Sequence, residues 1–369
     1  MRRIAVIGAG IIGASVAFRL VQGGARVWII DKSQSATGTT SASFAWANAY
    51  GKSPYDYFEL NYAGLKEHFR LREELVGKAP WLHLGGNLAW TEDEGALAEL
   101  CRRVDRMRSW GYAAEWWKAW RVNEVMESNV TFPSPDTSVA FFPEEMWVDA
   151  PQLTKTLIEL ARRDGGQTYL GTGVETIETR DGRVAAVRLT GGDRLSVDAV
   201  VNAAGVGADL LAAQLGRSLP LTSSKGLLVR LTIEGETPLG RIVHPQQVNI
   251  RPDGPGHILV HHESIDEKLE RGTGVEDSLC SELLERAQKV VPALKSAEVA
   301  GFQVGVRFTP KDGRSCVGAV PALPGYYEAV THSGVTLGPL VGRLLAREVL
   351  TGDVDTLIAP FRPARFTGS

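Results

Sequence analysis

A glycine-rich turn near the start of the chain places the strongest constraint on its fold. The segment Gly8-Ala9-Gly10-Ile11-Ile12-Gly13 directly follows the apolar run 4–7. In a strand–turn–helix unit the first glycine permits the tight turn, the second lets the backbone approach a pyrophosphate, and the third lets the helix pack against the strand. The N-terminus of the helix then favours the negative charge of the phosphates. The pattern therefore predicts a dinucleotide-binding unit, in which the helix runs to about Gln22.

An acidic residue completes this unit. Asp31 ends a second apolar run, 27–30. At the end of the second strand of such a unit, a carboxylate can accept hydrogen bonds from ribose hydroxyls. The following stretch, 36–43, contains only small side chains, so we expect it to contact a ligand rather than to build a core.

Composition and charge exclude several classes of function. With 40 Lys and Arg against 43 Asp and Glu, the net charge of −3 gives no electrostatic reason to bind nucleic acid or an anionic membrane. Three glycines interrupt the apolar N-terminus, which is therefore not typical of a secretion signal. We expect a cytoplasmic protein without stable membrane insertion.

No metal site is predicted. The three cysteines, Cys101, Cys280 and Cys316, lack the spacing of a zinc site or a disulfide framework. The run His261-His262-Glu263 is interpreted as part of a strand, where adjacent side chains point to opposite faces and cannot easily share one ion.

The rest of the chain alternates between predicted helices and strands. An N-cap at Asp149 with Pro151 at the first helical position predicts one helix start. The segment Thr91-Glu92-Asp93-Glu94 is interpreted as a capping box. Four tryptophans between Trp110 and Trp120 are expected in the core or wall of a second domain. Further predicted helices are 57–76, 276–291 and 335–350, and predicted strands are 174–180, 183–190, 198–202, 226–233, 248–251, 257–262, 298–307 and 326–330.

These elements predict an α/β chain with an α+β arrangement of two domains that are discontinuous in sequence. A Rossmann-type dinucleotide domain would comprise 1–45, 146–218 and 312–369. A substrate domain built on an antiparallel sheet would comprise 46–145 and 219–311.

Six segments together are far more specific than the glycine turn alone. They are 6–13, Thr39-Thr40-Ser41-Ala42, Asp149-Ala150-Pro151, 201–205, 305–313 and 332–339. Over nearly its full length, the chain resembles the flavin-dependent amine oxidoreductases of the glycine oxidase and D-amino-acid oxidase or dehydrogenase type. The resemblance implies FAD as the cofactor. One branch of the family attaches its flavin covalently, but Cys316 falls beyond Asp312-Gly313 rather than before the arginine segment, so we expect non-covalent FAD.

The resemblance also assigns residues to the cofactor. Asp31 and Lys32 would hold the adenosine ribose, and the backbone of Val174 would meet adenine. The turn 334–337 would direct backbone N–H groups at the flavin N1 and C2 oxygen edge, where a helix N-terminus stabilises the negative charge of reduced flavin; an ordinary helix cap is the alternative. The residues assigned to FAD are Gly8, Gly10, Ile11, Ile12, Gly13, Asp31, Lys32, Thr39, Thr40, Ser41, Phe44, Ala45, Trp46, Val174, Ala204, Gly205, Ser333, Gly334, Val335, Thr336 and Leu337.

Four residues are assigned to the substrate. In the family, an arginine in a Gly-Leu/Val-Arg segment grips the substrate carboxylate, and this position is Arg307; a surface or interdomain ion pair is the alternative. The chain departs from the glycine oxidase pattern at Asn249, where a tyrosine is common, and at His332, where some members carry a second arginine. With Trp46 near the flavin, these changes favour a larger, more apolar amine than glycine, such as a D-amino acid or an N-substituted glycine.

The expected reaction is hydride transfer from the substrate Cα–H to flavin N5. Water would hydrolyse the resulting imine to an oxo acid and an amine, and oxygen or a quinone would accept the electrons. Two alternatives remain at this point: an NAD-dependent dehydrogenase, since Asp31 would serve either ribose, and a non-catalytic flavoprotein or redox sensor. Both a monomer and a homo-oligomer are compatible with the sequence.

Overall fold

A six-stranded sheet organises the first module of the computed structural model, which describes residues 1–75, 77, 79–272, 274–275 and 277–366. Its central strand β1 (Arg3–Ile7) pairs in parallel with β2 (Arg26–Asp31) on one side and with β13 (Ala199–Asn202) on the other. The order is β19-β20-β13-β1-β2-β9, completed by β9 (Gln167–Leu170), β20 (Tyr326–Val330) and β19 (Cys316–Ala319). β19 is antiparallel to β20.

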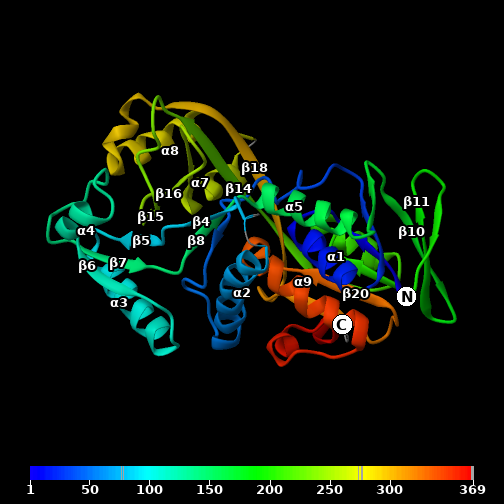
Figure 1. Ribbon diagram of the computed structural model, residues 1–369. Helices are drawn as coiled ribbons and strands as arrows, with labels where there is room; N and C mark the ends of the chain where they lie inside the picture. Colours follow the sequence, from blue (N-terminus) through cyan, green and yellow to red (C-terminus); the bar gives the residue numbers. More distant parts are fainter. Residues whose placement is uncertain (76, 78, 273, 276, 367–369) are drawn as a thin grey trace.

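Helices pack closely beside this sheet (Figure 1). α1 (Ile11–Gln22) packs against α5 (Ala150–Arg163) and against α9 (Gly334–Thr351), which in turn contacts α2 (Tyr55–Glu74). A Cβ on Gly342 would lie 2.7 Å from the backbone of Ser15, so glycine is needed where α9 approaches α1. A separate antiparallel sheet lies at one end of the molecule and consists of β10 (Val174–Arg180), β11 (Arg183–Leu189) and β12 (Arg194–Ser196).

An eight-stranded sheet organises the second module, in the order β18-β14-β17-β16-β15-β5-β7-β6. The strands are β5 (Asn87–Trp90), β6 (Glu115–Lys118), β7 (Ser138–Phe142), β14 (Leu221–Thr232), β15 (Ile242–Pro245), β16 (Asn249–Pro252), β17 (His257–His261) and β18 (Glu298–Pro310). The predicted sheet was antiparallel, but β5 and β15 pair in parallel. These two strands come from separate segments of the chain, and this pair joins the segments into one sheet.

Four helices accompany this sheet: α3 (Glu94–Ser109), α4 (Ala119–Val125), α7 (Glu263–Arg271) and α8 (Asp277–Val290). The predicted helix ends at Val76 and Glu276 lie outside the described residues. The long strands β14 and β18 pair along their whole lengths and extend from this module toward the first (Figure 1).

A small sheet of β3 (Trp46–Ala47), β8 (Met146–Val148) and β4 (Leu82–Leu84) lies at the junction of the predicted domains. Residues 46–47 and 146–148, which were assigned to different domains, are hydrogen-bonded partners in this sheet. The domain boundaries stay a prediction.

Three local predictions were wrong. The N-cap of α3 is Asp93, whose side chain accepts from Ala96 N–H at 2.7 Å, so Thr91 does not begin a capping box. His262 is the N-cap of α7 and does not continue the strand of His261, because its ring accepts a hydrogen bond from the Ser264 N–H. Trp120 is 54% exposed and belongs to no core.

Candidate active site

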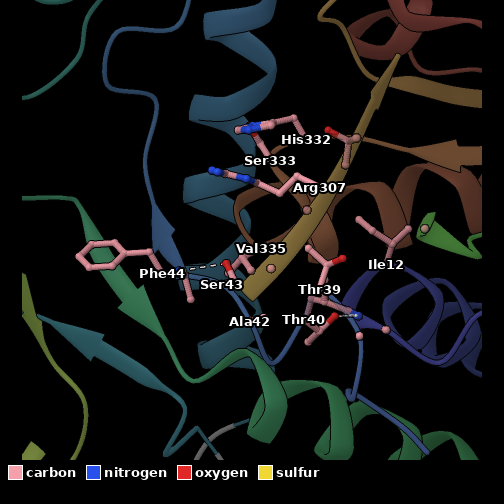
Figure 2. A pocket seen from close by; sticks show the side chains of 18 of the residues that line it. Ile12, Thr39, Thr40, Ala42, Ser43, Phe44, Arg307, His332, Ser333 and Val335 are labelled. Atoms are coloured by element: carbon pink, nitrogen blue, oxygen red, sulfur yellow. Dashed lines mark hydrogen bonds between the residues drawn. The ribbon is translucent and has the colours of Figure 1, made fainter. Parts of the chain in front are cut away.

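One cavity of about 770 Å³ is lined by residues of both modules (Figure 2). Its lining comprises residues of the glycine turn before α1, of the loop 36–44, of the start of α9, and of β14, β16, β17 and β18. In Figure 2, Arg307, Ser333 and His332 gather in one part of the view, and Thr39 and Thr40 in another.

The glycine turn is built for close backbone approach. Gly8 has a φ of +114°, and a Cβ there would collide with the carbonyl of Ala203. Gly10 is the N-cap of α1 and has no side chain to cap the helix. Thr40 Oγ1 accepts a hydrogen bond from Ile11 N–H at 3.1 Å. Because Gly10 carries no side chain and Gly10, Ile11 and Ile12 line the cavity, a phosphate group could approach the N-terminus of this helix.

Asp31 holds the turn to the end of β2. Its Oδ2 accepts from the N–H of Ala9 at 2.7 Å, and its Oδ1 accepts from the N–H of Ser33 at 2.8 Å. Asp31 and Lys32 also line the cavity, where they could contact ribose hydroxyls.

The N-terminus of α9 lines the same cavity as that of α1. Ser333 is its N-cap and makes no side-chain cap, and Gly334, Val335 and Thr336 line the cavity. His68 fixes this turn, because its Nε2 lies 2.9 Å from the carbonyl oxygen of Val335. Complete burial lowers the pKa of His68 to about 4, so the ring is neutral and donates this hydrogen bond. Two helix N-termini therefore present positive dipole ends to one cavity, as a dinucleotide with an anionic flavin requires.

Most residues assigned to FAD line this cavity: Gly8, Gly10, Ile11, Ile12, Asp31, Lys32, Thr39, Thr40, Phe44, Ala45, Trp46, Ala204, Gly205, Ser333, Gly334, Val335 and Thr336. Gly13, Ser41, Val174 and Leu337 are not part of its described lining. Gly13 instead allows close packing, because a Cβ there would collide with the carbonyl of Gly8. The contacts of all these residues with FAD stay predictions.

Arg307 lines the cavity and also forms an ion pair. Its Nη2 donates to Asp266 Oδ2 at 2.8 Å and to the carbonyl of Lys225 at 3.2 Å. Its Nε is buried and has no partner among the described residues. This ion pair joins β18 and α7 of the same module, so it is not an interdomain pair. The contact of Arg307 with a substrate carboxylate stays a prediction.

Trp46 lines the cavity, and a hydrogen bond to Glu145 holds its indole ring in place. Its Nε1 donates to Glu145 Oε2 at 2.7 Å, and the Tyr112 hydroxyl donates to Glu145 Oε1 at 2.8 Å. Burial raises the pKa of Glu145 to about 8. On the cavity side, the Trp46 ring lies 4.9 Å from His244 and 5.6 Å from Tyr50, so this wall is aromatic.

His332 and Asn249 complete the residues assigned to the substrate. Burial, with the nearby positive charges of Lys52 and Arg307, lowers the pKa of His332 to about 4, so its ring is neutral near pH 7. Asn249 lines the cavity and is 3% exposed. The structure therefore brings Arg307, Asn249, Trp46 and His332 to one cavity.

Several residues at this cavity were missed from the sequence. Lys52 lies in its lining, and burial lowers its pKa. Lys52 and Tyr50 follow the predicted ligand-binding stretch closely enough that their position could have suggested them. The other missed residues come from distant segments and include Arg103, His244, His261 and Glu263.

Comparison with known proteins identifies the class. The chain matches the model of the FAD dependent oxidoreductase family over residues 3–348 and belongs to that family. It is 27% identical to a glycine oxidase of Geobacillus kaustophilus over 99% of this chain and 97% of that protein. It is 25% identical to a glycine oxidase of Bacillus licheniformis over 95% of this chain and 94% of that protein. The solved structure of the Geobacillus kaustophilus glycine oxidase covers 100% of both chains at 26% identity with a TM-score of 0.86.

The expected family and fold are thus confirmed: the chain is an FAD-dependent oxidoreductase related to glycine oxidases. The cofactor of this family is FAD rather than NAD. Among the described residues, no helix is long and apolar enough to cross a membrane. Likewise, the described part of the chain contains no group of three or more His, Cys, Asp or Glu side chains suited to a metal.

Proposed function

We propose that this enzyme oxidises the C–N bond of an amino acid, with a D-amino acid or an N-substituted glycine preferred over glycine. The observation that carries the proposal is that Arg307 and the N-terminal turn of α9 line one cavity. A guanidinium is suited to a carboxylate because its planar fork can donate two parallel hydrogen bonds.

The residues of this chain would supply binding and orientation. The start of α1 would hold the pyrophosphate and Gly334 to Thr336 the flavin edge that becomes negative on reduction. FAD, when bound, supplies a hydride acceptor for the substrate Cα–H. Arg307 would fix the substrate carboxylate, and the neutral ring of His332 adds no charge to the site. Water then hydrolyses the product imine to an oxo acid and an amine.

Two features favour a substrate larger than glycine. The wall formed by Trp46, Tyr50 and His244 offers apolar surface to a side chain or an N-substituent. In addition, Asn249 and His332 stand where a tyrosine and a second arginine are found in the glycine oxidase pattern.

Anaerobic mixing of the FAD-loaded enzyme with an amine panel tests this proposal. The panel contains glycine, N-methylglycine, several D-amino acids and matched amines without a carboxylate. We expect an apolar D-amino acid or an N-substituted glycine to bleach the flavin absorbance fastest, and the matched amines to bleach it far more slowly. Re-oxidation by oxygen or by a quinone then identifies the electron acceptor. A flavin that no amino acid bleaches would contradict the proposal and favour a redox sensor.

A further inference from the structure

Lys52 lines the cavity with an ammonium group that no described residue binds. Its Nζ forms no hydrogen bond or ion pair within the described part of the chain, and it is not among the unpaired polar atoms that lack accessible surface. The centroid of the Tyr57 ring lies 5.8 Å from this atom. Burial lowers the pKa of Lys52, and no carboxylate offsets this shift, as an ion pair would. A half-buried cation without a partner is costly, and an anion in the cavity would satisfy it.

The turn that carries Lys52 is held against the start of α9. Before Lys52, the N–H of Asn48 donates to Thr336 Oγ1 at 3.4 Å. After Lys52, the Tyr57 hydroxyl lies 3.2 Å from Ser333 Oγ, within hydrogen-bond distance. The chain is thus fixed on both sides of Lys52, next to the helix N-terminus that borders the cavity.

Lys52 lies in the same part of the cavity as Arg307. Besides burial, the charges of Lys52 and Arg307 lower the pKa of His332, so both cations act on this one ring. In Figure 2, His332 and Arg307 lie in the same part of the view. Glu263 also lines the cavity, but it forms no ion pair with Lys52, and its Oε2 lies 3.9 Å from His262 Nε2. The substrate end of the cavity therefore contains a cation that no protein carboxylate balances.

Arg307 can offer only part of its guanidinium to a ligand. Its Nη2 already donates to Asp266 Oδ2 at 2.8 Å and to the carbonyl of Lys225 at 3.2 Å, and its Nε has no accessible surface. Nη1 has no partner among the described residues and is not one of the inaccessible atoms, so it is the nitrogen left for a ligand. A carboxylate bound by Nη1 keeps a second oxygen that needs another donor. Moreover, Asp266 balances the charge of Arg307, whereas Lys52 stays unbalanced.

We propose that Lys52 is a second binding residue for the substrate carboxylate, with Nζ bound to one carboxylate oxygen and Arg307 Nη1 to the other. This inference rests on the proposed function and names a residue that the sequence did not assign. An ammonium group suits the role, because it is a compact charge with three donors on a flexible stem. Lys52 would thus supply the second cation that the glycine oxidase pattern places at the position of His332. A ligand without a carboxylate leaves this cation unpaired and binds weakly.

An unreactive pair of ligands tests the role of Lys52. 3-Phenylpropanoate carries a carboxylate and no amine, so it is not oxidised, and 3-phenylpropanamide is its neutral counterpart. Calorimetry with the FAD-loaded protein gives the Kd of each ligand, and we expect the wild type to prefer the carboxylate at least about tenfold. Lys52→Met removes the charge at similar length and should weaken binding of the carboxylate about 10- to 100-fold, with binding of the amide changed less than about twofold. Lys52→Arg keeps the charge and should retain most of the affinity.

Lys66→Met is the matched control. Lys66 is exposed on α2, its Nζ lies 3.9 Å from the centroid of the Tyr62 ring, and it is not part of the described cavity lining. The control variant also removes one positive charge beside a tyrosine, yet it should change the Kd of neither ligand. Unchanged binding of the amide shows that the cavity of Lys52→Met is intact. If Lys52→Met loads FAD poorly, Lys52→Gln repeats the measurement with a polar, uncharged side chain.

The outcomes separate this inference from the proposed function. If no amino acid bleaches the flavin, the proposed function fails, while calorimetry still reports whether Lys52 binds a carboxylate. Equal binding of the two ligands by the wild type, or no binding of 3-phenylpropanoate, would overturn the inference. Unchanged binding of the carboxylate by Lys52→Met would also overturn it while amine oxidation remains established. A shifted midpoint potential of the flavin in that variant would then assign the charge of Lys52 to the cofactor instead.

Discussion

We expect Glu145 to make the free energy of unfolding depend on pH. A substitution that cannot ionise should remove this dependence. The carboxyl group is fully buried, and burial raises its pKa from 4.5 to about 8. The native state therefore binds this proton more tightly than the unfolded state, so the contribution of Glu145 is full below pH 4.5 and is lost as the pH rises to about 8. The slope is about 1.4 kcal/mol per pH unit, which amounts to roughly 3 to 4 kcal/mol between pH 5 and pH 8.

Glu145→Gln keeps the volume of the side chain and cannot ionise. We expect the variant to become more stable relative to the wild type by roughly 3 to 4 kcal/mol as the pH is raised from 5 to 8. A constant offset from altered hydrogen bonds to Trp46 and Tyr112 would not change this slope. Shifts from buried histidines such as His68 cancel in the comparison.

The measurement is the free energy of unfolding from guanidinium titrations of the FAD-loaded protein at several pH values. Glu159→Gln is the control, because the Glu159 side chain is 70% exposed, and its curve should run parallel to that of the wild type. If the curve of Glu145→Gln is also parallel to that of the wild type, Glu145 is ionised in the native protein and the reasoning is refuted.

Three further predictions concern the cofactor and the substrate. Gly10→Val should abolish FAD loading, because a side chain there occupies the space of the pyrophosphate; a variant purified fully yellow would contradict this. Acid precipitation should release all FAD, since Cys316 is buried and lies outside the described cavity lining; flavin that stays in the pellet would disprove it. Arg307→Ala should lower the efficiency of flavin reduction roughly 30- to several thousand-fold (about 2–5 kcal/mol), and Arg307→Lys less. In stopped-flow reduction by an amino acid, a wild-type rate and concentration dependence for Arg307→Ala would show that the carboxylate is bound elsewhere.

The elements whose signals come from residues close together in the sequence could be predicted. α1 ends at Gln22 and β2 at Asp31, as the sequence predicts, because the glycines and the acidic residue act within one local unit. The N-cap at Asp149 is confirmed, since its side chain accepts from Gln152 N–H at 2.9 Å. The strand 326–330 also matches its prediction.

The residues that hold the cavity side chains in place could not be predicted from the sequence, because they depend on contacts between distant segments. Trp46 and Glu145 are 99 residues apart in the sequence and meet only because β3 pairs with β8. α7 follows β17 after one residue and carries Asp266. The four residues 261–264, which span the end of β17 and the start of α7, are all polar. Neither a strand period nor a helix period therefore marks this boundary, and Asp266 could not be placed from the sequence.

The loop 36–43 packs directly against β18, so the positions of these two segments depend on each other. Thr39 Oγ1 donates to the carbonyl of Val306 at 2.6 Å, and a Cβ on Gly305 would collide with the carbonyl of Ala42. The strand that carries Arg307 therefore rests directly on the loop that borders the cofactor space. A side chain at Gly305 would push the loop away from β18, the strand that carries Arg307. A substitution at Gly305 would therefore displace both the loop and the strand that carries Arg307, and it should alter FAD retention and amino-acid binding together if both segments act as proposed.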